Sequence, residues 1–154
     1  MSRSRFDSLE QEVFLSLWRT YDRLRALEDE LFAQFDLTAQ QYNVLRILRS
    51  ERPRGVATLT LAERLISRAP DVTRMLDKLA RRGLIARERQ TDDRRIVEVA
   101  ITEAGLELLG QIAAPLRACH TRQLGHLSED QLRQLADLLR AARRPHEPPD
   151  SVWR

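Results

Sequence analysis

The stretch from Ala69 to Ile101, APDVTRMLDKLARRGLIARERQTDDRRIVEVAI, carries the strongest structural signal in this chain. Its first half has the spacing of a helix that ends at Gly83, and its second half predicts two strands joined by a polar turn, TDDR. Between Arg64 and Arg95 there are ten Lys and Arg residues but five acids, an excess of five positive charges, whereas the whole chain has a net charge of +3. A basic helix beside a basic hairpin suits the grooves of DNA.

Length and composition exclude several classes of protein. A chain of 154 residues is long enough for one domain, or for one domain with a helical extension. The single cysteine, Cys119, excludes an internal disulfide and a paired-cysteine metal site, and it suits a reducing compartment. We find no apolar run that could span a bilayer and no apolar signal core at the N-terminus, so the expected location is the cytoplasm.

Long amphipathic helices are expected at both ends of the chain. Apolar residues recur every three or four positions from Phe6 to Phe35, which predicts a first helix of about 30 residues. Thr102 is expected to cap a second long helix over residues 103–125, and Ser128 with Gln131 forms a capping box for the last helix. Because a small domain rarely needs such long helices for its own core, we expect a second copy of the chain to cover them.

Shorter elements are expected between these helices. They are a helix from a capping box at Thr38 and Gln41 to about Arg49, a short helix over Leu59 to Ile66 capped by Thr58, a helix from Pro70 to about Arg82, and strands over 85–90 and 95–101. No polar cap precedes Pro70, so Asp71 is expected to replace it through the helix dipole. Two helices with a short connection and a following hairpin are typical of a winged helix-turn-helix.

The predicted fold class is therefore mainly α with a small β-hairpin wing. Residues 37–102 are expected to form a winged helix-turn-helix DNA-binding region. Residues 1–36 and 103–142 are expected to form a helical dimerisation region, and the proline-rich residues 143–154 a disordered tail.

Five segments occur in order at natural spacing: LAERL at 61–65, VTRMLDKL at 72–79, RRGLI at 81–85, DRR at 93–95 and ITEAG at 101–105. Together they resemble the MarR (multiple antibiotic resistance regulator) family of dimeric bacterial transcription factors, and the resemblance extends over residues 6–142. It implies a recognition helix at 70–82 and a wing at 86–100. In such proteins an arginine of the wing's Asp-x-Arg motif, here Asp93 and Arg95, enters the minor groove while the aspartate orients it.

Candidate DNA-contacting residues lie at the start of the recognition helix and at the wing tip. Asp71, Thr73 and Arg74 are at the helix end that reaches base edges, and Arg74 suits a paired contact to guanine. A guanidinium at Arg95 suits a narrow groove, and Asp93 is expected to hold its rotamer before binding. The remaining candidates, for phosphates and the turn, are Ser67, Arg68, Lys78, Arg87 and Arg94. The alternative is a solvated surface whose charges pair with one another or aid solubility.

An effector site is implied by the resemblance, because family effectors bind between the dimer helices and the DNA-binding lobe. Trp18 is a tentative lining residue, and the alternative for it is an anchor in a dimer interface. The other tentative ligand-binding residues are Tyr21, Tyr42, Arg46 and His120. Cys119 has two interpretations: an oxidant sensor activated by nearby basic residues, or a core residue on an apolar stripe.

The sequence predicts a regulator and not an enzyme. It contains no Ser-His-Asp set, glycine-rich phosphate loop or paired-carboxylate signature, and His120 and His126 are six apart, so neither a cofactor nor a metal is expected. We expect a homodimeric repressor of a pseudo-palindromic operator that a small ligand relieves. The alternatives are a ligand-sensing or protein-partner module with a degenerate helix-turn-helix that does not bind DNA, and a small helical enzyme.

Overall fold

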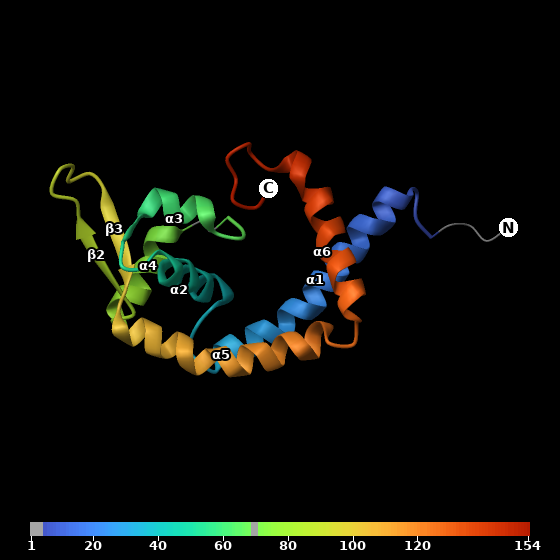
Figure 1. The fold of residues 1–154 in the computed structure, drawn as a ribbon, viewed down its shortest axis with the longest axis horizontal. Helices are drawn as coiled ribbons and strands as arrows, with labels where there is room; N and C mark the ends of the chain where they lie inside the picture. The colour runs from blue at the N-terminus through green and yellow to red at the C-terminus, as the bar shows by residue number, and fades with distance from the viewer. Residues whose placement is uncertain (1–4, 69–70) are drawn as a thin grey trace.

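The computed structural model describes residues 5–68 and 71–154 and is mainly helical with a small antiparallel sheet, the fold class predicted from the sequence. Its elements are α1 (Leu9–Ala33), α2 (Ala39–Glu51), β1 (Val56–Ala57), α3 (Thr58–Arg64), α4 (Val72–Arg81), β2 (Ile85–Arg89), β3 (Val97–Ile101), α5 (Glu103–Leu124), α6 (Glu129–Arg143) and the 3-10 turn η1 (Arg144–His146). Figure 1 shows a lobe of α2, α3, α4 and the sheet at one end of α5, with α1 and α6 at the other.

The lobe has a continuous apolar core. Each of its helices and β3 contributes a side chain that is fully buried; examples are Val44, Leu61, Leu79 and Val99, all at 0% exposure. The core extends along α5 through Leu109 and Ile112 and takes one large side chain, Phe32, from the end of α1. Burial of this kind stabilises a fold by about 25 cal/mol per Å² of apolar surface, so this core stabilises the lobe.

The sheet contains one strand more than the predicted hairpin. β3 lies in the middle and pairs with β2 through Ile85 and Ile101, and with β1 through Val56 and Val99. Residues 56–57 were expected to belong to a loop, because a strand of two residues is too short to show an alternating pattern. The third strand closes one edge of β3 and fixes the base of the wing against α3.

Most of the predicted helix starts are confirmed, and one is wrong. The capping boxes at Thr38 and Ser128 are both present, and Thr102 accepts a hydrogen bond from the backbone of Gly105. Thr58, however, is the first residue of α3 and caps nothing: Ala57 is the N-cap, and the Thr58 hydroxyl donates to the carbonyl oxygen of Val97 at 3.2 Å. The pairing of β1 with β3 brings that carbonyl within reach, so a tertiary contact replaces the local one.

The helix predicted to begin at Pro70 is described from Val72, and Ala69 and Pro70 lie outside the described residues. Asp71 is its N-cap, with a carboxylate oxygen that accepts from the backbone N–H of Arg74 at 3.0 Å. Asp71 therefore caps the helix by a direct hydrogen bond and not through the dipole alone. Gly83, at φ 71°, ends the helix in the left-handed conformation that the sequence predicts.

The helices outside the lobe bury little. α1 has 25 residues, fewer than the expected 30, and Phe32 is its one buried residue; α6 has none among the residues described. Large apolar side chains on both helices are exposed instead, among them Phe14, Trp18 and Leu138 at 63%, 64% and 68%. None of the helices in the described ranges is long and apolar enough to cross a membrane.

Residues 143–154 were expected to be disordered, and the structure gives them a defined path at the end of α6. Arg143 Nε donates to the carbonyl oxygen of Trp153 at 3.0 Å, and the Ser151 hydroxyl donates to Glu147 at 2.7 Å. These contacts close the segment onto itself, and Figure 1 shows it turned back toward α3. The proline-rich composition did not indicate them, because they join residues up to ten positions apart.

Candidate nucleic-acid interface

Helix α4 separates its apolar and polar side chains onto two faces. Leu76 and Leu79 are buried against the core, while Thr73, Arg74 and Lys78 are exposed. Within the described part of the chain, the side chains of Arg74 and Lys78 form no hydrogen bond or ion pair. The helix thus presents a hydroxyl and one unpaired cation near its capped start, and a second unpaired cation in its last turn. This arrangement suits base and phosphate contacts.

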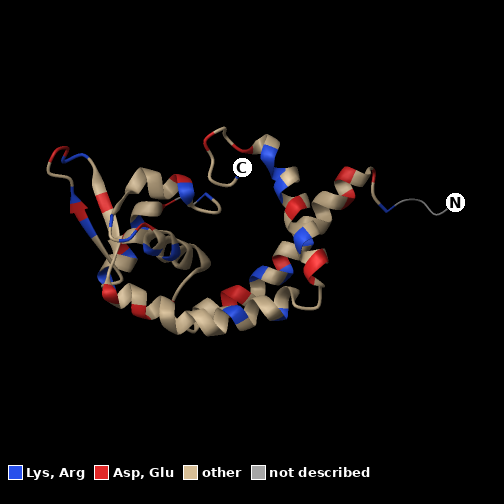
Figure 2. Ribbon diagram, in the orientation of Figure 1, with Lys and Arg blue, Asp and Glu red and all other residues tan. Residues whose placement is uncertain are grey.

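The tip of the wing holds an arginine beside a carboxylate. Arg95 Nε lies 3.2 Å from Asp93 Oδ1, and the same oxygen accepts from the Arg95 backbone N–H at 3.0 Å. The Arg95 side chain is nevertheless 91% exposed, so the pairing orients the guanidinium without covering it. Figure 2 shows acidic and basic segments meeting at this tip.

These contacts favour the ionised form of Asp93. The backbone hydrogen bond from Arg95, and then the side-chain hydrogen bond from the same residue, lower the pKa of Asp93 below its ordinary value. A carboxylate that is charged throughout the neutral range keeps its attraction for the guanidinium. The spacing of the two residues predicted this pair, and the structure contains it; its role in DNA binding stays a prediction.

Two further contacts brace the hairpin, and the sequence reasoning missed both. Arg89 Nη1 donates to the carbonyl oxygen of Arg94 at 2.8 Å, and the Gln90 backbone N–H donates to that of Ile96 at 2.9 Å. Arg94 itself is exposed, with its carbonyl used in this way and its side chain unpaired among the described residues. The Arg89 contact crosses the turn between residues five apart, and no local pattern marks it.

Three of the residues that were expected to contact phosphates differ from one another in their interactions. Arg87, on β2, forms an ion pair at 2.6 Å with Asp77 on α4, so it joins the wing to the helix. The Ser67 hydroxyl accepts from Gln40 Nε2 at 2.5 Å, which ties the segment after α3 to α2. Arg68 is exposed and, within the described ranges, without a hydrogen bond or ion pair.

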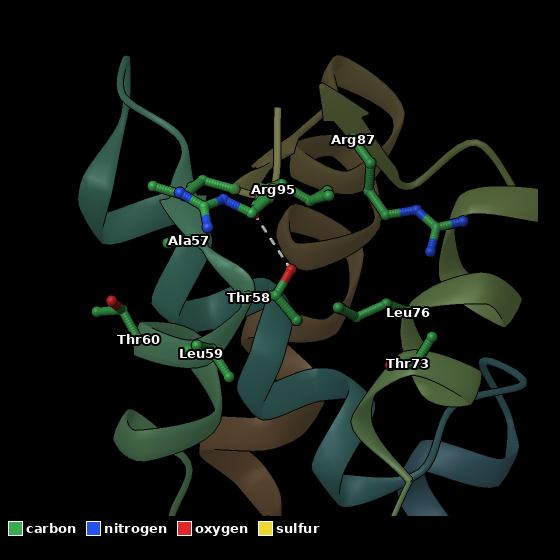
Figure 3. A pocket seen from close by; sticks show the side chains of 10 residues that line it. Ala57, Thr58, Leu59, Thr60, Thr73, Leu76, Arg87 and Arg95 are labelled. Atoms are coloured by element: carbon green, nitrogen blue, oxygen red, sulfur yellow. Dashed lines mark hydrogen bonds between the residues drawn. The ribbon is translucent and has the colours of Figure 1, made fainter. Parts of the chain in front are cut away.

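A cavity of about 430 Å³ lies between the wing, α3 and α4. Figure 3 shows Arg95 and Arg87 at its rim, with Thr73 and Leu76 from α4 facing Ala57 to Thr60 across it. Its floor is apolar and its rim is basic. The cavity therefore separates the wing from α4, and the ion pair between Arg87 and Asp77 joins the two at one side.

The tentative effector residues do not meet in one site. Tyr42 stacks on Phe32 with ring centroids 4.7 Å apart, Arg46 donates to Asn43 at 2.9 Å, and His120 lies 2.8 Å from Gln123. Trp18 and Tyr21 are exposed on α1, at 64% and 61%. Four cavities on the described part of the chain have linings that contain none of these five.

Cys119 lies on the buried face of α5 and is 5% exposed. Burial raises the pKa of its thiol, with Glu28 adding to that shift and Arg122 opposing it. The thiol is the neutral, less nucleophilic form at neutral pH, which agrees with the core interpretation.

Comparisons with known proteins agree with this geometry. The model of the MarR family matches residues 37–97. The chain is 29% identical over 132 residues to the HTH-type transcriptional repressor MdtR of Bacillus subtilis, covering 86% of this chain and 84% of that protein. A MarR transcription factor from Planctomyces limnophilus is 58% identical, with a TM-score of 0.71, over 88% of this chain and 98% of its own. Sco3205 of Streptomyces coelicolor, a family regulator solved in complex with DNA, has a TM-score of 0.85 at 18% identity, over 99% and 98% of the chains.

Proposed function

The chain belongs to the MarR family of transcriptional regulators, and from that premise we propose that two copies of it form a repressor of a pseudo-palindromic operator. Each recognition helix, α4, enters a major groove, and each wing enters the flanking minor groove. Half-site centres lie about 10–11 bp apart, one turn of the double helix. Residues 37–102 contact the DNA in this proposal, while residues 1–36 and 103–142 hold the two copies together.

The observation that carries the proposal is the oriented Arg95 at the wing tip. An arginine that is 91% exposed normally loses side-chain freedom on binding, and the contacts from Asp93 reduce that loss. A narrow minor groove attracts such a guanidinium through its negative potential. Arg74 on α4 then supplies base recognition, and Arg68, Lys78 and Arg94 supply phosphate contacts.

The exposed apolar residues of α1 and α6 support a homodimer. Side chains such as Phe14, Trp18 and Leu138 are each more than 60% exposed in the single chain. Contiguous apolar surface of this kind marks an interaction site, and a second copy of the same face is the commonest way to cover it. The repressor MdtR, which is similar along most of the chain, supports repression as the direction of control.

Relief by a small ligand completes the proposal. A ligand that binds better to a dimer with misplaced recognition helices shifts the population away from the DNA-binding form. The five tentative residues, Trp18, Tyr21, Tyr42, Arg46 and His120, come from α1, α2 and α5, and in this proposal the second copy completes the site that they line.

The test is binding to the DNA upstream of the chain's own gene, measured by gel shift over a range of salt concentrations. Wild-type protein is expected to shift this DNA, and Arg95→Ala to weaken binding and lower the salt slope by about one. Arg117→Ala, which removes an exposed positive charge from α5, is the matched control and should leave the slope near that of the wild type. A folded dimer that shifts no DNA at low salt would favour the alternative, a sensor or partner-binding module.

A further inference from the structure

Arg82 links the end of the recognition helix to the end of α1. It follows the last residue of α4, and its side chain reaches the connection between α1 and α2. Nη1 donates to the carbonyl oxygen of Asp36 at 2.5 Å, and Nη2 donates to that of Phe35 at 3.1 Å. The planar guanidinium holds both acceptors in a fixed geometry, which a single flexible donor cannot do.

The two acceptors lie in the turn that follows α1. The last turn of α1 contains no basic residue, although the carbonyl end of a helix carries a partial negative charge. Asp36 follows at φ 56°, the one left-handed residue other than glycine in the described ranges. Arg82 therefore supplies from α4, some 46 positions away in sequence, the cation that α1 lacks.

The residues that follow Arg82 are fixed to α5. The Thr102 hydroxyl donates to the carbonyl oxygen of Gly83 at 2.6 Å, and the Thr102 backbone N–H donates to that of Leu84 at 3.1 Å. A Cβ at Gly105 would lie 2.4 Å from the Leu84 carbonyl oxygen, so α5 sits directly against this segment. Residues 82–84 thus form a joint (the 82–84 joint) between α4 and both long helices.

The two sides of the joint differ in strength. On the α5 side the attachment uses the Thr102 hydroxyl, a backbone N–H and close contact at Gly105. On the α1 side, within the described residues, its hydrogen bonds come from one exposed arginine. Phe32 anchors α1 in the lobe core, and Arg82 adds the hydrogen-bonded link between the turn after α1 and the end of α4. An attachment through one side chain is easily made or lost.

We propose that Arg82 is a positioning residue that sets the separation of the two recognition helices without contacting DNA. This rests on the proposed function, because the separation has meaning only in a dimer that reads two half-sites. Without Arg82, the lobe that contains α4 keeps its fold and its base contacts, but its angle to α1 is less restricted. Binding to one half-site is then unchanged, while the preference for correctly spaced half-sites is lost.

Arg81→Ala is the matched control for Arg82→Ala. Arg81 is the preceding residue and is exposed, as Arg82 is. In the described part of the chain its side chain forms no hydrogen bond or ion pair. Both variants remove one positive charge from the same end of α4, and only one removes the link to α1. Arg82→Lys keeps the positive charge but lacks the planar guanidinium that donates to both carbonyl oxygens.

The experiment uses a duplex selected from a random library by the full-length wild-type protein. Dissociation constants are measured for this duplex, for versions with one and two base pairs inserted between the half-sites, and for a single half-site. Arg82→Ala is expected to lose about tenfold in affinity for the selected duplex, the size of lost hydrogen bonds to a charged group, with half-site binding unchanged. The ratio between correct and inserted spacing should fall accordingly, and Arg82→Lys should recover part of it.

Arg81→Ala should keep the wild-type spacing ratio. An Arg82→Ala variant that keeps this ratio, or that weakens every duplex equally, would overturn the proposal. A second readout does not depend on DNA: spin labels at Lys78→Cys, in a Cys119→Ser background, report the distance between the two recognition helices of the dimer. Arg82→Ala should broaden that distribution. Broadening of the distribution in a dimer that binds no duplex would support the positioning role of Arg82 and reject the repressor function. An unchanged distribution, or a monomeric wild type, would overturn the positioning role.

Discussion

The lobe and the long terminal helices use their apolar residues in opposite ways. In the lobe, Leu61 and Leu79 are fully buried by neighbours from the same chain, whereas Trp18 and Leu138 on α1 and α6 are more than 60% exposed. The lobe is therefore complete in a single copy, and the terminal helices are not. In our proposal the first region recognises DNA and the second sets how two such regions are held.

The largest expected effect comes from the lobe core. Leu79→Ala should lower the free energy of unfolding by about 2–5 kcal/mol, because it removes a fully buried side chain and leaves a cavity. Denaturant unfolding monitored by circular dichroism measures this loss, which should be the same at every protein concentration. If the loss in unfolding free energy depends on protein concentration, the lobe needs a partner to fold, and the contrast between the lobe and the terminal helices would not hold.

Trp18→Ala should have the next largest effect, and on association instead of folding. Its side chain is 64% exposed in one chain, so its removal should cost the isolated chain little. At the centre of an interface, loss of a tryptophan weakens dimerisation by about 2 kcal/mol or more. Sedimentation equilibrium should show the weaker dimer, with Arg19→Ala on the same exposed part of α1 as a control. An unchanged dimer would place the interface elsewhere.

Arg74→Ala should change which DNA is bound and not only how tightly. Loss of a paired contact to guanine reduces discrimination by about 1–3 kcal/mol at one position in each half-site. Competition between operator variants substituted at single positions measures it. Trp18→Ala should weaken all variants alike, which separates the roles of the two regions. An equal loss on every sequence for Arg74→Ala would make it a phosphate contact.

The smallest effect is expected at Cys119, which packs under the terminal helices. Because burial raises the pKa of its thiol, folding lowers the thiolate fraction at a given pH, and this suppression persists until the pH rises through the folded pKa. At pH 8 iodoacetamide should thus modify the folded protein more slowly than the protein in denaturant. Peroxide should leave DNA binding unchanged. If peroxide weakens DNA binding by the wild type but not by Cys119→Ser, the oxidant-sensor interpretation would be restored.

Local signals explain what the sequence could predict. The caps at Thr38, Thr102 and Ser128 act within three residues, and the alternation of β3 lies within one strand, so the helices and the wing were predictable. The Asp93 and Arg95 pair is also local, being two residues apart.

Contacts between distant residues explain what was missed. The second partner of β3, at Val56, lies 43 positions away along the chain, and its pairing is what draws the Thr58 hydroxyl away from a capping role. Asp77 on α4 pairs with Arg87 on β2, and Arg82 donates to the turn after α1, 46 positions away along the chain. No periodicity in the sequence reports such pairs, because each depends on how finished elements pack together.

The wing tip has one more consequence, for how this regulator can change over generations. Every hydrogen bond described there, from Arg89 to Ile96, is made between residues of the hairpin itself. Substitutions on the exposed face of α4 therefore leave the tip intact. If α4 reads bases and the wing enters the minor groove, as we propose, a new operator sequence can be acquired without rebuilding the minor-groove contact, so the base-reading part can diverge while its anchor stays the same.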